Sequence, residues 1–218
     1  MKLHPFVRLV AKMHFNNCFN PYSDHCKIHD NKNASKIRAQ TLSDIIYSAT
    51  SKPIDAIWIG RDLGYRGGRR TGLALTDDIH IAKHAKRWDL LAERPTLGTA
   101  TAERTAAIIW SMLDQIDARI FLWNVFPLHP HESGKPFTNR QHNALERRAG
   151  EDVLHRLISL LNPSHIIAIG NDAAATAHRV TSSVPIHCVR HPSYGGQNIF
   201  ISQLSEIYGC SPHQKNLL

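Results

Sequence analysis

Four short apolar segments stand out along the chain, and each is bounded by residues typical of turns. They are rich in Ile, Val and aromatic side chains, which is typical of strands buried on both faces. The segments cover residues 55–60, 119–124, 165–170 and 186–191. We interpret them as the strands of one sheet.

Between these strands, apolar residues recur at spacings of three and four, as expected for helices with one buried face. The spacing predicts helices over residues 101–116, 145–161 and 172–180, with further helices near 41–49 and 198–208. The helix over 145–161 ends just before Asn162 and Pro163. Strands that alternate with helices favour a parallel sheet covered on both faces. The pattern therefore predicts an α/β fold, a three-layer α/β/α sandwich around a four-stranded, mostly parallel sheet.

The length of 218 residues favours one domain over two. We expect residues 1–50 to form a helical segment packed on a core of residues 51–210. Residues 16–33, which are rich in Asn, Asp, His and Lys, are expected to form a surface loop. No segment approaches the roughly 18 consecutive apolar residues of a membrane span, and residues 1–15 lack the features of a secretion signal. We therefore expect a cytoplasmic protein, and a monomer.

The charge of the chain indicates a polyanionic partner. It has 26 Lys and Arg residues against 18 Asp and Glu residues, which gives a formal net charge of +8, and 15 His residues add further potential charge. Clustered Lys and Arg side chains displace counterions from nucleic acids, so nucleic acid is the favoured partner class. A basic protein without such a partner is the simpler alternative.

Two sets of side chains have the chemistry of metal ligands but not a familiar spacing. The sets are Cys18, His25, Cys26 and His29, and His129, His131 and Glu132. The four cysteines of the chain form no C-x-x-C pair, and neither set fits a recognised tetrahedral pattern. We expect free thiols, and no metal or cofactor.

Polar side chains gather where three of the predicted strands end. Asp62 follows the first strand, Asn124 ends the second, and His191 with Ser193 follows the fourth. In open parallel sheets the ligand lies outside the carboxyl ends of the strands. We therefore expect a functional site at this edge.

Four motifs in this order resemble the uracil-DNA glycosylase superfamily, over residues 54–204. The turn Gly60-Arg61-Asp62-Leu63-Gly64 resembles the family's Gly-Gln-Asp-Pro-Tyr or Gly-Glu-Ala-Pro-Gly motif, and the following GRRTGLALT resembles its Thr-Gly-x-x-Phe-Thr run. Asn124 stands where the family has its base-reading asparagine, and HPS at 191–193 matches its second motif. The pattern formed by Asn139, Arg140 and Glu146 also resembles a pattern of the family.

The resemblance implies an α/β enzyme that flips a nucleotide out of DNA and cleaves its N-glycosidic bond. Such cleavage builds positive charge on the sugar and negative charge on the leaving pyrimidine. Asp62 suits the first charge and the activation of water, and His191, as a neutral imidazole, suits the second by donating to the pyrimidine O2. Asn124 would read the base edge. Flipping is required because the target base is inaccessible inside a duplex.

The expected DNA contacts surround these three residues. Arginines of the glycine-rich turn are candidates for phosphate contacts, the loop after His191 would hold flanking phosphates, and its tyrosine would fill the vacated base stack. The expected contacts are Arg66, Arg69, Arg70, Pro192, Ser193, Tyr194, Gly195 and Gly196.

Three departures from the family pattern affect the base pocket, which we expect Arg61, Gly64, Tyr65 and Leu75 to form. Arg61 replaces Gln or Glu, Gly64 stands where strict uracil enzymes have Tyr, and Leu75 replaces a stacking Phe. The smaller side chains leave room at C5 of the base. Some superfamily members implicated in phage defence remove glucosylated 5-hydroxymethylcytosine, and such a base is the favoured substrate here.

Other functions remain open at the level of sequence. A conventional uracil-DNA glycosylase in repair is the first alternative, because other uracil-cleaving branches also have Gly at the position of Gly64. The second is a basic DNA-binding module that has lost catalysis. The third is an α/β enzyme that acts on free nucleotides.

Overall fold

The computed structural model describes residues 2–210 and contains the predicted parallel sheet. The strand order is β3-β2-β5-β6, and all neighbouring strands run parallel. The strands are β2 (Ala56–Asp62), β3 (Ile120–Phe126), β5 (His165–Ile169) and β6 (Ile186–Val189). All four predicted strands are confirmed. β2 and β3 each continue two residues beyond the predicted carboxyl end.

The predicted helices are also confirmed. They are α2 (Ala34–Ser51), α5 (Arg104–Leu113), α6 (Ala144–Leu161), α7 (Asn171–Val180) and α8 (Gln197–Tyr208). Three shorter helices are α1 (Pro5–Ala11), α3 (Gly68–Thr71) and α4 (Ile81–Lys86). α6 stops where predicted, because Asn162 takes a left-handed conformation. Within residues 2–210 no helix is long and apolar enough to cross a membrane.

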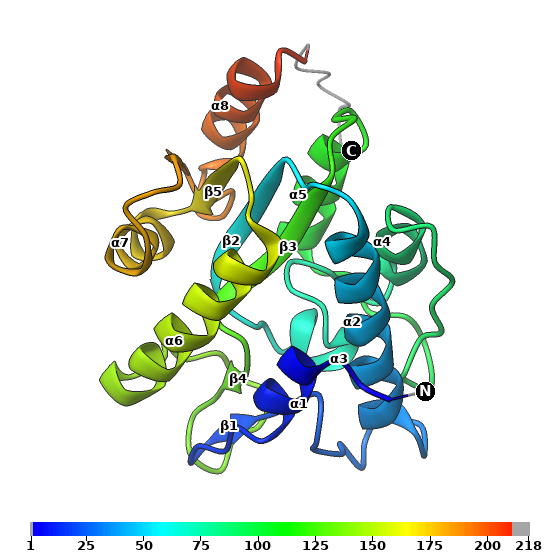
Figure 1. Ribbon diagram of the computed structural model, residues 1–218. Coiled ribbons are helices and arrows are strands. Elements are labelled where there is room, and N and C mark those ends of the chain that lie inside the picture. The colour runs from blue at the N-terminus through cyan, green and yellow to red at the C-terminus, as the bar shows by residue number, and fades with distance from the viewer. Residues whose placement is uncertain (1, 211–218) are drawn as a thin grey trace.

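Helices lie on both faces of the sheet (Figure 1). The side chains of the sheet divide the core into two layers. In β2, Ile57 and Ile59 face a cluster that includes residues of α1, α2, α6 and α7. Ala56 and Trp58 face the opposite cluster, with residues of α5 and α8. This alternation follows from the two-residue period of a strand. It confirms the three-layer α/β/α arrangement.

Residues 16–33 form the expected surface loop only in part. β1 (Cys18–Phe19) pairs antiparallel with β4 (His129–Pro130), and several polar residues of the segment are buried. Asn20 donates to the Val10 carbonyl, and the Asp30 carboxylate pairs with Arg38. These polar residues are buried because their polar groups find partners inside the fold.

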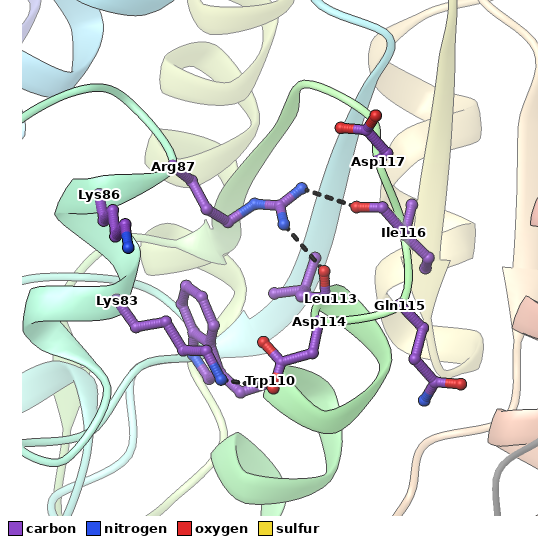
Figure 2. A pocket seen from close by; sticks show the side chains of 9 residues that line it. All are labelled: Lys83, Lys86, Arg87, Trp110, Leu113, Asp114, Gln115, Ile116 and Asp117. Carbon is purple, nitrogen blue, oxygen red and sulfur yellow. Dashed lines mark hydrogen bonds and ion pairs between the residues drawn. The ribbon is translucent and has the colours of Figure 1, made fainter.

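A cavity of about 360 Å³ lies at the amino edge of the sheet (Figure 2). Residues 114–117 form part of its wall and lead into the amino end of β3. Arg87 donates to the carbonyls of Leu113, Ile116 and Ala118, so its guanidinium completes the hydrogen bonds of the chain that follows α5. Arg87, which lines this cavity, therefore has a structural role. The cavity lies away from the carboxyl ends of the strands.

Candidate active site

The three residues that the sequence singles out lie at the carboxyl edge of the sheet. β2 and β3 are in register, with Gly60 opposite Asn124 and Asp62 opposite Phe126. His191 follows the end of β6 by two residues. The parallel topology therefore brings residues from distant parts of the sequence to one edge, as the position rule for open α/β sheets predicts.

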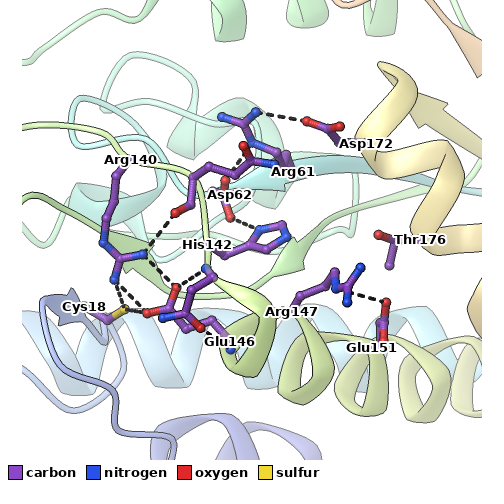
Figure 3. Close-up of polar contacts among 12 residues, drawn as sticks. Cys18, Arg61, Asp62, Arg140, His142, Glu146, Arg147, Glu151, Asp172 and Thr176 are labelled. Atoms are coloured by element: carbon purple, nitrogen blue, oxygen red, sulfur yellow. Dashed lines mark hydrogen bonds and ion pairs between the residues drawn. The ribbon is translucent and has the colours of Figure 1, made fainter.

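Asp62 is held by two neighbours at the end of β2 (Figure 3). Its Oδ1 lies 2.5 Å from His142 Nδ1, and its Oδ2 accepts a hydrogen bond of 2.8 Å from Arg61 Nε. Arg61 also donates to Asp172 at the start of α7. The side chains of Asp62 and His142 are only 8% and 5% exposed. The carboxylate therefore has a fixed orientation at a site shielded from bulk water.

His142 was not among the residues predicted from the sequence. It directly precedes Asn143, whose side chain and that of Glu146 form a capping box at the start of α6. Arg140 donates two hydrogen bonds to the Glu146 carboxylate, at 2.7 and 2.6 Å. These contacts fix the chain on both sides of His142. One feature of the sequence could have pointed to His142. It lies between Arg140 and Glu146, two residues that resemble the family pattern.

The contact with Asp62 determines what His142 can do. An imidazole that donates from Nδ1 to a carboxylate keeps, in its neutral form, a lone pair on Nε2. Such a nitrogen can accept a proton from a water molecule. Asp62 and His142 together form a carboxylate–histidine pair of the kind that serves in general base catalysis.

Asn124 is a buried amide without a partner for its oxygen. Asn124 is 2% exposed, and its Oδ1 accepts no hydrogen bond among residues 2–210. A buried polar atom left unpaired costs about 1–3 kcal/mol. Gly60 lies beside it, and a Cβ there would sit 3.5 Å from Oδ1. The amide oxygen therefore has unused capacity to accept a hydrogen bond.

Leu75 lies next to Gly60 and Asn124, and its backbone is strained. Its Cδ2 would lie 2.9 Å from a Cβ on Gly60, so Leu75, Gly60 and Asn124 are neighbours. Its φ of +55° lies in the left-handed region, and its carbonyl accepts a hydrogen bond of 3.2 Å from Trp110 Nε1. A residue other than glycine costs of order 1–3 kcal/mol in this conformation, and such strain is common at functional sites.

The contacts of His191 leave one of its ring nitrogens, Nε2, available to donate a hydrogen bond. Nδ1 lies 2.7 Å from the Ser193 hydroxyl and accepts a hydrogen bond of 3.2 Å from the Ser193 backbone N–H. Because the backbone N–H can only donate, Nδ1 is the acceptor, and the neutral ring carries its proton on Nε2. Burial lowers the pKa of His191, and the positive charges of Arg61 and Arg190 lower it further. The imidazole is therefore neutral near pH 7, with Nε2–H available to donate.

These features agree with the comparison with known families. The family model of the uracil DNA glycosylase superfamily matches residues 54–203, which is more than half of the chain. The chain belongs to the uracil DNA glycosylase superfamily. Membership in this superfamily supports a DNA glycosylase, of the hydrolase class.

A solved structure has a fold similar to that of this superfamily member. The crystal structure of wild-type Pedobacter heparinus SMUG2 is similar to it, with a TM-score of 0.62 and 14% sequence identity. The match covers 94% of this chain and 97% of that one. At this identity the likeness shows the fold alone. No curated protein matches the sequence of the chain.

The three arginines that follow the glycosylase's first motif have different environments. Arg66 is exposed and donates to the Tyr65 hydroxyl. Arg69 is buried, with its guanidinium carbon 3.7 Å from the centre of the Phe19 ring, and Arg70 is buried with the Asp78 carboxylate at 2.8 Å. We therefore withdraw Arg69 and Arg70 as phosphate contacts, because both guanidinium groups serve inside the fold. Arg66 remains a candidate.

The loop of the second motif is tightly built, with an exposed tip. Pro192 and Gly196 are buried, whereas Gly195 is exposed and Tyr194 is 97% exposed. Tyr194 has a φ of +50°, and Gly195, the residue after it, a φ of +75°. The glycosylase therefore presents an aromatic side chain outward, next to His191.

The two sets of possible metal ligands do not form a metal site. Cys18 Sγ donates to the Glu146 carboxylate at 3.2 Å, whereas Cys26 Sγ contacts His29 Nδ1 at 3.5 Å. His129 is neutral, because burial and Arg69 lower its pKa to about 3, and both of its nitrogens have hydrogen-bond partners. Over residues 2–210, no three His, Cys, Asp or Glu side chains are placed to hold a metal ion.

Proposed function

We propose that this chain is a monofunctional glycosylase that flips a modified pyrimidine out of DNA and hydrolyses its N-glycosidic bond. The product is an abasic site and a free base. The proposal rests on the buried, oriented carboxylate of Asp62, which lies beside His142 at the same sheet edge as the unpaired amide of Asn124. We further propose that the protein acts as a monomer, in the cytoplasm and without a cofactor.

The chemistry assigned to Asp62 and His142 follows from their hydrogen bond. As the bond between C1′ and the base breaks, its electron pair goes to the base and C1′ becomes cationic. The Asp62 carboxylate stabilises this cation, as anions do in glycoside hydrolysis. A water molecule adds to C1′ and gives its proton to His142 Nε2, while Nδ1 stays bonded to Asp62. The resulting imidazolium is stabilised by the same carboxylate.

His191 and Asn124 act on the base. The Nε2–H of neutral His191 donates to the pyrimidine O2, where negative charge develops as the base departs. Loss of one such donor costs about 10²- to 10³-fold in rate. Asn124 pairs with the base edge, because its amide offers both a donor and an acceptor. The unpaired Oδ1 supports this role.

Binding of DNA is assigned to the exposed groups around this edge. Arg66 contacts a backbone phosphate, and the loop from Pro192 to Gly196 holds phosphates next to the flipped nucleotide. The exposed Tyr194 ring fills the gap that the flipped base leaves in the stack. The net charge of +8 favours this association at low salt.

The base that we favour is a bulky 5-modified cytosine, such as glucosylated 5-hydroxymethylcytosine, which would give the enzyme a role in defence against phage. Gly64 and Leu75 support this substrate because neither places an aromatic ring in the expected base pocket. Uracil is the alternative substrate, with a role in base-excision repair. A DNA-binding module without catalysis is the second alternative.

A substrate panel tests the proposal. The purified protein is incubated with duplex and single-stranded DNA that carries uracil, a thymine mismatch, 5-hydroxymethylcytosine or its glucosylated form, and abasic sites are revealed by alkali. We expect cleavage at glucosylated 5-hydroxymethylcytosine, and cleavage at uracil alone would favour the repair enzyme. Salt-sensitive binding without cleavage of any DNA would refute the proposal and favour the binding module. Turnover of free nucleotides would favour an enzyme of nucleotide metabolism.

A further inference from the structure

Glu103 is the N-cap residue of α5, but its side chain does not cap the helix. Its backbone N–H donates to Asp77 at 2.7 Å, and its side chain accepts no hydrogen bond from the first turn of α5. The carboxylate lies instead against the turn that follows Asp62. A Cβ on Gly64 would lie 2.7 Å from Glu103 Oε1, and one on Gly67 would overlap with Oε2. The two glycines thus leave room for a carboxylate.

This carboxylate lacks the partners that neighbouring acids have. Asp77 accepts hydrogen bonds from the side chain of His80 and the backbone of Glu103, and Asp78 accepts them from Arg70. Among residues 2–210, the side chain of Glu103 accepts none. Burial and the negative charge of Asp77 raise the pKa of Glu103 to about 6, although Arg66 opposes the shift. The carboxylate therefore has unused capacity to accept hydrogen bonds.

Glu103 lies next to the segment that lines the expected base pocket. The Leu75 side chain and the Asn124 amide both lie next to Gly60, and the carbonyl of the residue after Leu75, Thr76, lies next to Gly67. The Glu103 carboxylate faces the same side of Gly67. Residues 75–76 thus run from the neighbourhood of Gly60 and Asn124 to that of Gly67 and Glu103.

We infer that Glu103 is a specificity-determining residue that accepts hydrogen bonds from the amino and hydroxyl groups of a modified cytosine. This inference rests on the proposed function and names the chemistry of its substrate. The exocyclic amine of cytosine and the hydroxyls of a 5-substituent are donors, which a carboxylate binds well. Uracil presents the lone pairs of O4 at the same position, and a carboxylate repels them. Glu103 selects the cytosine form of the base against the uracil form.

The test compares cytosine forms of the base with uracil forms, and 5-hydroxymethylcytosine and 5-hydroxymethyluracil are a pair with the same 5-substituent. Single-turnover cleavage rates are measured for wild-type protein, Glu103→Ala and Glu103→Gln on duplexes with 5-hydroxymethylcytosine, its glucosylated form, 5-hydroxymethyluracil and uracil. In Glu103→Ala, the preference for the cytosine forms should fall about 10- to 100-fold, the loss expected for a hydrogen bond to a charged group. Glu103→Gln should raise cleavage of the uracil forms, because an amide can donate to O4.

The outcomes separate this inference from the proposed function. Glu132→Gln is the matched control, because Glu132 is an exposed acid paired with Lys135, and it should leave the preference unchanged. An active wild-type protein whose preference is the same in both Glu103 variants would overturn the assignment of Glu103 alone. A wild-type protein that cleaves none of the DNAs would overturn the proposed function, and the inference with it. Thermal unfolding confirms that each variant is folded.

Discussion

Glu103 also makes a prediction about stability, because its carboxylate is ionised at a site that provides little compensation. Burial and Asp77 raise its pKa from 4.5 to about 6. One pKa unit corresponds to about 1.4 kcal/mol, so the ionised group costs the folded state about 2 kcal/mol at neutral pH. Glu103→Gln removes the charge and keeps the shape. We expect the variant to be about 1–2 kcal/mol more stable than the wild type at pH 8.

The pH dependence fixes the sign of this effect. The folded state holds its proton more tightly than the unfolded state, so the wild type gains stability as the pH falls through about 6 toward 4.5. The variant has no group that titrates at this position. The difference in unfolding free energy between the two proteins should therefore shrink as the pH falls, and should approach zero near pH 4.

Urea unfolding at pH 8, 6 and 4.5 measures this difference. The control is Glu132→Gln, in which an exposed acid with a surface ion pair is replaced and the unfolding free energy should change by less than about 1 kcal/mol at every pH. A destabilised Glu103→Gln at pH 8 would refute the reasoning, as would a difference between variant and wild type that does not vary with pH. Either result would mean that the Glu103 carboxylate has favourable partners in the folded protein.

Three further substitutions test the roles of individual side chains. His142→Ala should lower the single-turnover rate about 10²- to 10⁴-fold with unchanged DNA affinity, whereas the exposed His155→Ala should have no effect on either. Arg70→Ala should reduce the unfolding free energy by about 3–5 kcal/mol, measured in urea, because it leaves the buried Asp78 carboxylate without the positive charge that it pairs with. Arg66→Ala should leave stability unchanged and lower the salt dependence of DNA binding by about one unit of slope, and an unchanged slope would exclude a phosphate contact.

The elements of the fold were predictable because their patterns are local. Apolar runs and spacings of three and four identified all four strands of the sheet and the five longer helices. The carboxyl ends of β2 and β3 were placed two residues early. Asp62 is polar and looked like a loop residue, yet it pairs with Phe126 across the sheet. Pairing between strands depends on the partner, which a local pattern does not contain.

Burial of polar residues was the main error. Residues 16–33 and the pair Arg69 and Arg70 were interpreted as surface groups because they are polar or charged. In the structure Asp30 pairs with Arg38, and Arg70 pairs with Asp78, so these charges are neutralised inside the fold. Each pair joins separate segments of the chain, and composition does not reveal such partners.

The candidate site was partly predictable for a related reason. Asp62, Asn124 and His191 each follow a strand, so the topology rule selected them before any contact was known. His142 and Glu103 lie before helices, on segments that do not belong to the sheet. Only tertiary packing brings one to Asp62 and the other to Gly64.

The most direct test of the central claim is the release of a free base by wild-type protein and by Asp62→Asn, measured by mass spectrometry under single-turnover conditions on glucosylated 5-hydroxymethylcytosine DNA. We predict that the wild type releases the intact modified base and leaves an abasic sugar. Asp62→Asn should release it at least about 10²-fold more slowly and bind the DNA with the same affinity. Equal rates for the two proteins would contradict the role of Asp62, and no released base from any DNA of the panel would contradict the assignment of glycosylase activity.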